Sequence, residues 1–505
     1  MNETTVRERA PERRMAVNMI CNLGSHLISA AIAFFLTPFL ISELGLEVYG
    51  FYPVAIELMA VFALMSGLLN STATRYVTIE VAGGREENAR RYFSTVFFAN
   101  IVLSGLLMLP MAAAILFCNR YLNVPAGLVG ELRIFFLLML ASVLVDGIFS
   151  VFSAAYSVTE RLDLRAGGQL VATLVKAGLL WVLLGTWTSP SIVSIGVAVL
   201  AASFASGLVN LTMSRYLAPR LTVSTAAVSR SYLRQVVASG FWYSFSRLGV
   251  FLITGAFLFA VNLLYGAKTG GAYSVALTVS RVLSGVLMVL AGLFMPVMEK
   301  RFALGDTTAL AETVRKGQKT VGFFALVGVA MCIGFCREFF SLWLGAENTP
   351  TLRLLTVLLV LPALSVASAL PVLDLALVMN RMRRLSLFFV GGALLGLSVA
   401  IACGVFFRTP VLVMAAVSAG VQIVWYSGVL PLVAGRLLSA EPLTFYLPIL
   451  RTYLGCAVAV GFVVFVKSVF AVDSWLRLTV MLGVCLLAVM AMGYLALFGK
   501  PKFKM

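Results

Sequence analysis

Residues 385–433 read LSLFFVGGALLGLSVAIACGVFF RTP VLVMAAVSAGVQIVWYSGVLPLV, and this stretch decides the fold. Two apolar runs, 385–407 and 411–433, flank a tripeptide at 408–410. Each run is about 20 residues long, the length that an α-helix needs to cross the ~30 Å hydrocarbon core of a bilayer. The stretch therefore predicts two membrane-spanning helices joined by a very short loop.

The same pattern recurs along the chain wherever charge, proline or glycine interrupts an apolar run. Hydrophobic residues make up 61% of the sequence and charged residues 12%, which excludes a water-soluble globular protein. The fold class is therefore an all-α polytopic membrane protein of about 14 transmembrane helices. The predicted spans are 15–41, 51–73, 92–118, 131–157, 169–187, 191–213, 236–262, 272–297, 320–341, 353–379, 385–407, 411–433, 448–470 and 475–498.

Basic residues gather in alternate loops of this topology. They are frequent in the N-terminal tail and near 75–91, 215–234, 300–319 and 381–384. The loops on the opposite side hold only Arg120, Lys268 and Arg408. Because cells retain Lys and Arg in the cytoplasm during insertion, both termini should be cytoplasmic. This bias mainly explains the net charge of +17. The basic residues also attract the anionic lipids of the inner leaflet.

Residue types that several functions require are scarce. The chain has one histidine, His26, so a zinc site of paired histidines is not expected. Cys332 and Cys336 lie one helical turn apart, a spacing that favours packing over half a metal site. No basic stretch is interleaved with exposed aromatic residues, so nucleic acid is not an expected partner. We expect no metal, no cofactor and no catalytic residue, because the outer loops are too short for a catalytic domain.

The chain resembles itself when it is shifted by about 221 positions. The shift places Gly45 on Gly266 and Gly50 on Gly271, in the loops after the first and the seventh predicted helix. A shift that spans six helices keeps the two halves parallel, related by an axis along the membrane normal. The sequence therefore predicts two similar lobes.

Polar residues on the first and seventh helices follow the same shift. Four polar residues of the first helix fall on four residues of the seventh, at turn spacing on each helix: Asn18 on Ser239, Asn22 on Tyr243, Ser25 on Ser246 and His26 on Arg247. We expect these two polar stripes to line a shared cavity. A protonation switch at His26 does not follow from the sequence.

A local pattern lies within residues 15–95. It consists of Asn22, Phe35, Thr37, Pro38, Leu44, Gly45, Tyr49, Gly50, Gly67, Arg75 and Tyr76. This pattern resembles the polysaccharide-unit flippases of the multidrug/oligosaccharidyl-lipid/polysaccharide exporter superfamily. The resemblance implies two six-helix lobes related by pseudo-two-fold symmetry around a central cavity, with a C-terminal helix pair at one flank.

The resemblance also implies a function. Such a protein would move undecaprenyl-diphosphate-linked oligosaccharide units from the inner to the outer leaflet of the bacterial cytoplasmic membrane by alternating access, for surface polysaccharide biosynthesis. The partners it implies are this lipid-linked oligosaccharide and membrane lipids. H⁺ or Na⁺ is a candidate coupling ion, and the polysaccharide polymerase machinery is a candidate protein partner.

The expected organisation has six parts. They are a cytoplasmic N-terminal tail at 1–14, an N-lobe at 15–213, a cytoplasmic linker at 214–235, a C-lobe at 236–433, a C-terminal helix pair at 448–498 and a cytoplasmic tail at 499–505.

Ionisable side chains inside the predicted spans are the best candidates for a site, because such a group near the bilayer centre costs at least ~2.5–3.5 kcal/mol. Candidate substrate-binding residues are Arg247, Arg281, His26, Asn22, Tyr243 and Lys176. Candidate coupling-ion or charge-pair residues are Glu57, Asp146 and Asp374, and Arg75, just past the second span, is a candidate gate or membrane anchor. A guanidinium can hold two phosphate oxygens at once, so Arg247 and Arg281 on neighbouring helices suit a diphosphate.

An alternative is that each base pairs with an acid and only joins helices. Lys176 would then pair with Asp146, and an arginine with Asp374 or Glu57. Other functions also stay open: a peptidoglycan-precursor flippase, a drug/cation antiporter of the same superfamily with acids in its lumen, or, with less support, a membrane-embedded glycosyltransferase or polymerase.

Overall fold

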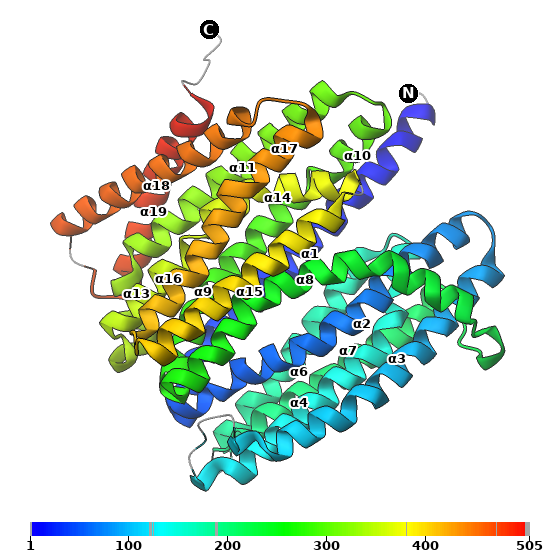
Figure 1. Cartoon of the computed structure of the whole chain (residues 1–505), viewed down its shortest axis with the longest axis horizontal. Helices are drawn as coiled ribbons and strands as arrows, with labels where there is room; N and C mark the ends of the chain where they lie inside the picture. Colours follow the sequence, from blue (N-terminus) through cyan, green and yellow to red (C-terminus); the bar gives the residue numbers. More distant parts are fainter. Residues whose placement is uncertain are drawn as a thin grey trace. The chain divides into compact units, whose positions relative to one another are not determined.

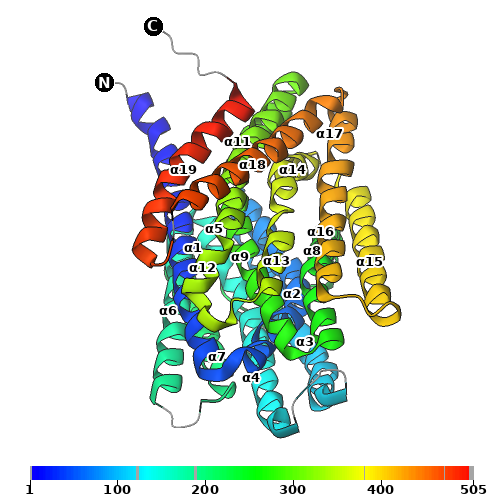
Figure 2. The same ribbon diagram turned by 90° about the vertical axis from the view of Figure 1, so that its left-hand side faces the viewer.

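The computed structural model describes residues 3–120, 124, 126–186, 190–379, 381–470 and 472–499, which form helices and short connections (Figures 1 and 2). The α-helices are α1 (Glu3–Tyr49), α2 (Phe51–Ala82), α3 (Glu86–Leu116), α4 (Val129–Phe149), α5 (Ala154–Val158), α6 (Leu162–Thr186), α7 (Val193–Leu217), α8 (Arg230–Tyr265), α9 (Ala267–Gly292), α10 (Met295–Ala303), α11 (Thr307–Gly334), α12 (Cys336–Leu344), α13 (Pro350–Val360), α14 (Ala363–Val378), α15 (Met382–Phe406), α16 (Val411–Ile423), α17 (Leu430–Leu438), α18 (Leu443–Val469) and α19 (Trp475–Phe498). A π-helix, η6 (Val424–Val429), joins α16 to α17, and short 3-10 turns are η1 (Cys118–Arg120), η2 (Ala126–Leu128), η3 (Ser150–Ser153), η4 (Thr225–Ala227) and η5 (Gly345–Glu347).

These helices confirm the predicted fold class. Within the described residues, 13 helices are long and apolar enough to cross a membrane, and α2, bent by 42° between Phe51–Ala60 and Phe62–Ala82, brings the number to 14. They follow the order of the predicted spans. A helix suits the bilayer core because it satisfies every backbone hydrogen bond within its own segment.

The ends of α2 and α3 differ from the prediction. The sequence predicts spans at 51–73 and 92–118, whereas α2 continues to Ala82 and α3 begins at Glu86. Loss of hydrophobicity marks where a segment leaves the membrane, but a helix can continue into water beyond that point. Arg75 therefore lies inside α2, and its predicted place after the second helix is wrong.

The chain divides into two compact units. Unit 1 contains Met1–Phe251 and Gly266–Gly271, and unit 2 contains Leu252–Tyr265 and Ala272–Met505. In unit 1, α4 packs against α7, α7 against α6, and α2 against α3. In unit 2, α11 packs against α14 and α18, α18 against α19, and α15 against α16.

Small residues let these helices approach closely. In unit 1, a β-carbon added at Gly196 of α7 would lie 2.9 Å from Cβ of Leu138 on α4. In unit 2, one added at Gly455 of α18 would lie 2.6 Å from Cδ1 of Leu326 on α11. Membrane helices associate through such tight packing because lipid tails are as apolar as their side chains.

Glycines sit at both loops that the sequence repeat relates. Gly45, where α1 is kinked, has a φ of 79°, and Gly266, between α8 and α9, has a φ of 85°. Residues with a side chain rarely adopt this region, which explains a glycine at each position. Each glycine turns the chain sharply. We call the two turn segments, residues 45–50 and 266–271, the two elbows.

The two elbows contact each other within unit 1. A β-carbon added at Gly50 would lie 2.6 Å from the carbonyl oxygen of Ala267. One added at Gly271 would lie 2.6 Å from the carbonyl oxygen of Leu46. All four residues fit the offset of about 221, so the contact is reciprocal, as expected for two segments related by a two-fold axis.

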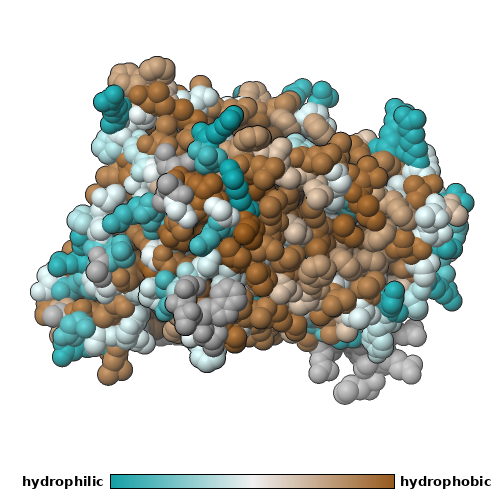
Figure 3. Space-filling view, turned by 90° about the horizontal axis from the view of Figure 1, so that it is seen from below, coloured by the Kyte–Doolittle hydropathy of each residue, from teal (hydrophilic) through white to brown (hydrophobic). Residues whose placement is uncertain are grey.

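Large apolar side chains remain on the surface, and they cover broad areas of the face seen in Figure 3. Phe388, Phe406 and Leu487 are 70%, 80% and 73% exposed. A soluble monomer rarely exposes apolar areas of this extent, whereas a bilayer covers them. The protein is therefore a multi-pass membrane protein.

Candidate functional site

The first candidate residues lie in unit 1. Arg247, on α8, has an exposed side chain. His26, on α1, is half-buried, and its Nε2 atom is buried without a hydrogen-bond partner among the described residues. The side chain of Tyr243 lies outside the described residues. The predicted equivalence of His26 and Arg247 in a shared cavity stays a prediction.

Part of the polar stripe on α1 serves packing. The Asn18 side chain donates to the carbonyl of Glu160 (2.9 Å) and accepts from the backbone N–H of Asp163 (3.0 Å). Ser25 donates to the carbonyl of Ala166 on α6 (3.1 Å). These bonds fix α1 against α6, so two members of the stripe have a structural explanation.

Among the described residues, Asn22 and His26 make no such bond to another helix. Asn22 donates to the carbonyl of Asn18 within α1 (2.8 Å), and this bond leaves its side-chain oxygen as an acceptor. Asn22 and His26 thus stay candidates for cargo contacts.

The expected ion pair between Lys176 and Asp146 is absent from the part of unit 1 that the structure describes. Asp146, on α4, accepts instead from the hydroxyl of Ser203 on α7 (3.0 Å). Lys176, on α6, is half-buried. Asp146 thus joins α4 to α7 through a hydroxyl instead of through Lys176, and the roles of both residues stay predictions.

Two further carboxylates lie on α2 and α14. Glu57, on α2 of unit 1, is 6% exposed. Asp374, on α14 of unit 2, is half-buried, and no ion pair involves it in the described chain. Arg281, on α9 of unit 2, has an exposed side chain.

Arg75 and Tyr76 differ in their surroundings. Arg75 is exposed. Tyr76 stacks on Tyr92 of α3, with ring centroids 4.8 Å apart and planes 5° apart, and Tyr232 meets Tyr92 edge-on at 4.4 Å. Tyr76 therefore belongs to an aromatic cluster of unit 1. The role of Arg75 as gate or anchor stays a prediction.

The cysteines fit packing better than metal binding. The Cys336 thiol is buried and donates to the carbonyl of Arg353 (3.8 Å). No group of three metal-ligating side chains occurs among the described residues.

Two features of unit 2 were not singled out from the sequence. One is the ion pair between Lys467 and Glu338, which joins α18 to α12. The other is a groove beside α15 with arginines at one end. The clue for the groove was the run Arg381 to Arg384 before a glycine-containing span, but topology alone explained those arginines.

Comparisons with known proteins bear on the family. The sequence model of the family described as "Polysaccharide biosynthesis protein" matches residues 15–302, more than half of the chain. The chain belongs to this family. The match includes the local pattern of the first helices and confirms the resemblance found there.

A curated relative and two solved structures agree with this assignment. The relative is "Uncharacterized membrane protein EpsK" of Bacillus subtilis (strain 168), 26% identical over 344 residues that cover 68% of each chain. The lipid II flippase MurJ, in its inward closed conformation, matches with a TM-score of 0.65 at 13% identity, over 95% of this chain and 100% of its own. A multidrug resistance MATE family transporter of the MOP superfamily, facing inward, matches with a TM-score of 0.63 at 15% identity, over 89% and 98%. At these identities the likeness to the solved structures shows a shared fold.

Proposed function

We propose that this family member moves undecaprenyl-diphosphate-linked oligosaccharide from the inner to the outer leaflet of the bacterial cytoplasmic membrane by alternating access. The observation that carries the proposal is membership of the polysaccharide biosynthesis family in a chain with the fold shared by a lipid flippase and a multidrug transporter. A protein with this fold can move a lipid carrier across a bilayer without an enzymatic step. We place both termini in the cytoplasm, because of the loop arginines.

The cargo's diphosphate suits arginine within the membrane. Arg247 and Arg281 are exposed on helices that cross the bilayer, and a guanidinium stays charged and binds phosphate through two parallel hydrogen bonds. Outward movement through an inside-negative potential releases ~2.3 kcal/mol per negative charge per 100 mV. Membrane voltage or a coupled H⁺ or Na⁺ can therefore drive export.

A peptidoglycan precursor is the second candidate cargo, favoured by the fold shared with the lipid II flippase. Both cargoes are diphosphate lipids, so the intramembrane arginines serve either. Cell-surface glycan output and peptidoglycan synthesis, measured in a strain that lacks the chain, distinguish the two.

The test of the proposal is the variant Arg247→Ala. We expect its export activity to be ~10- to 100-fold lower than that of the unaltered chain, because a charge-assisted contact contributes ~1.5–3 kcal/mol. Arg247→Lys should recover part of the activity, since an ammonium keeps the charge without the planar fork. The measurement is surface glycan normalised to the amount of protein in the membrane.

A structural role for Arg247 predicts a different outcome. Arg247→Ala would then lower protein abundance, and a second change at Glu57 or Asp374 would restore it. Normal export by Arg247→Ala, or full rescue by neutralising an acid, would end the proposed diphosphate contact.

A further inference from the structure

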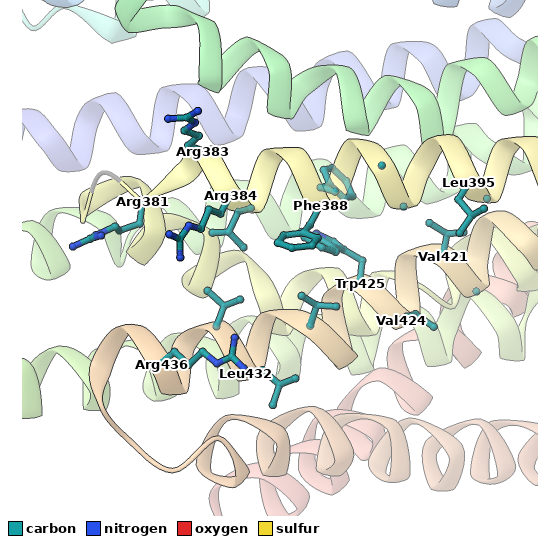
Figure 4. A pocket seen from close by; sticks show the side chains of 18 of the residues that line it. Arg381, Arg383, Arg384, Phe388, Leu395, Val421, Val424, Trp425, Leu432 and Arg436 are labelled. Atoms are coloured by element: carbon teal, nitrogen blue, oxygen red, sulfur yellow. The ribbon is translucent and has the colours of Figure 1, made fainter.

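A cavity of about 1420 Å³ lies in unit 2 between α15 on one side and α16, η6 and α17 on the other (Figure 4). We call it the α15–α17 groove. Its apolar lining includes Phe388 and Leu395 of α15, Val421 of α16, Val424 of η6 and Leu432 of α17. Phe388, Leu395 and Val424 are 70%, 67% and 66% exposed, so the groove is open to an apolar ligand.

Arginines line one end of the groove. Arg383 and Arg384 lie in the first turn of α15, Arg436 in the last turn of α17, and Arg381 just before α15. Figure 4 shows Arg384 and Arg436 pointing from opposite walls toward the space between the two helices. No aspartate or glutamate is among the described residues that line the groove. The end therefore carries a concentrated positive charge.

Glycines and an aromatic pair shape the rest of the groove. A β-carbon added at Gly391, Gly392 or Gly420 would have no described atom of another helix within 4 Å, so these positions face open space. Phe389 and Trp425 stack at 5.2 Å and are 5% and 7% exposed, which holds α15 against η6. The glycines therefore keep the α15–α17 groove open along its length, and the Phe389–Trp425 stack fixes the two walls to each other at one point.

The charged end lies on the side of the membrane to which α19 returns. After α17 ends at Leu438, α18 and α19 cross the bilayer once each, so Phe498 ends on the same side as Arg436. The arginine bias predicts that this side is the cytoplasm. A lipid of the inner leaflet would meet the groove with its headgroup at the arginines and its tail along the apolar wall.

We propose that the α15–α17 groove binds a polyprenyl diphosphate lipid in the cytoplasmic leaflet, with the diphosphate between Arg384 and Arg436 and the prenyl chain along Phe388, Leu395 and Val424. The proposal rests on the proposed function and adds a capture site distinct from Arg247 and Arg281. The lipid would wait there before transport.

Charge and chain number favour this lipid over a phospholipid. Two guanidiniums on facing walls, with Arg381 and Arg383 close by and no carboxylate among the described lining residues, match a headgroup with two adjacent phosphates. One groove between one pair of helical walls matches one long chain. Phosphatidylglycerol has one phosphate and two chains, and cardiolipin has two separated phosphates and four chains, so neither matches both ends.

The experiment measures lipid binding to the purified full-length chain by native mass spectrometry. The probes are undecaprenyl diphosphate, phosphatidylglycerol, cardiolipin, phosphatidylcholine and inorganic diphosphate, each titrated separately. The unaltered chain should bind undecaprenyl diphosphate most tightly. The double variant Arg384→Gln/Arg436→Gln should bind it about tenfold more weakly or worse, because two charge-assisted contacts are lost.

A second variant tests the tail independently of charge. Gly392→Leu places a side chain in the open groove without a clash at the β-carbon, and it should weaken undecaprenyl diphosphate binding while inorganic diphosphate binding stays unchanged. The matched controls are Arg315→Gln/Lys316→Gln, which removes two exposed charges on α11, and Gly461→Leu, at an open position on α18. Both controls should bind like the unaltered chain.

Several outcomes would overturn the proposal. One is unchanged undecaprenyl diphosphate binding in both groove variants, and another is an equal loss of binding in the control variants. A third is cardiolipin or phosphatidylglycerol that binds as tightly as undecaprenyl diphosphate and whose binding the same groove variants abolish. Binding needs no transport, so the two proposals fail separately. Export by the unaltered chain with no groove-dependent binding would remove the capture site alone, and groove-dependent binding without any export would remove the proposed function alone.

Discussion

Lys467 and Glu338 form an ion pair with little exposure to solvent. Lys467 Nζ lies 2.6 Å from Glu338 Oε2, and the side chains are 17% and 15% exposed. Lys467 also donates to the carbonyl of Gly334, the last residue of α11 (2.5 Å), where a helix leaves carbonyls unsatisfied. One ammonium group therefore connects α18, α12 and the end of α11.

Removing one partner of this pair should destabilise the protein. Lys467→Met leaves the Glu338 carboxylate uncompensated, and we expect a loss of ~3–5 kcal/mol in the free energy of unfolding. The double variant Lys467→Met/Glu338→Gln should recover part of the loss, because no unpaired charge remains. Thermal unfolding of the purified protein measures both.

The exposed pair of Arg477 and Asp473 provides a control. Its side chains are 60% and 64% exposed, so Arg477→Met should change stability by ~0–1 kcal/mol. Equal effects of Lys467→Met and Arg477→Met would contradict the argument from burial.

The sequence identified residue types better than residue partners. It singled out Asp146, but the partner is the hydroxyl of Ser203, because the register of α4 against α7 decides which polar group arrives there. It grouped Asn18 with Asn22 on one stripe, yet Asn18 binds the α5–α6 connection. Periodicity gives the face of a helix, and only the neighbouring element decides what that face meets.

The contact between the two elbows predicts how substitutions at Gly50 and Gly271 change the free energy of unfolding. Gly50→Ala brings a β-carbon within 2.6 Å of the Ala267 oxygen, and Gly271→Ala does the same at Leu46. Each change should cost ~1–3 kcal/mol, since backbone atoms cannot move aside like a flexible side chain. The double variant should cost less than the sum of the two, because both changes separate the same pair of segments. Unfolding measurements on the single and double variants give these values.

Gly67→Ala on α2 is the matched control. A β-carbon there has no described atom of another helix within 4 Å, and alanine favours a helix by up to ~1 kcal/mol over glycine. Gly67→Ala should therefore be neutral or stabilising. Additive losses at Gly50 and Gly271 would show that the elbows act independently.

Helix order followed from the sequence, but local helix geometry did not. Apolar runs set the number and sequence of spans because bilayer thickness fixes their length. The π-helix η6 escaped this reasoning, since its hydrogen-bonding pattern leaves no mark on hydropathy. Its Gly428 carbonyl accepts from the Tyr446 hydroxyl of α18 (2.5 Å), a partner that appears only when the helices have packed.

At the scale of the whole molecule, the sidedness of the membrane protein is testable. The bias of the basic residues predicts that residues 85–91 and 298–319 lie in the cytoplasm and that Lys268, in the first turn of α9, lies on the other side. Glu87, Thr308 and Lys268 are all exposed, so a cysteine at each is open to a reagent. In intact cells, a membrane-impermeant thiol reagent should label Lys268→Cys and leave Glu87→Cys and Thr308→Cys unlabelled.

Permeabilised cells complete this last test. Glu87→Cys and Thr308→Cys should become labelled once the reagent reaches the cytoplasm, which shows that both thiols are reactive. The unaltered chain measures the background from its seven native cysteines. Labelling in the reverse sense would invert the topology, and it would also move Arg384 and Arg436 to the outer leaflet, where a lipid carrier made in the cytoplasm could not reach the groove before transport. Sidedness therefore decides whether these arginines can capture cargo or only meet it after release.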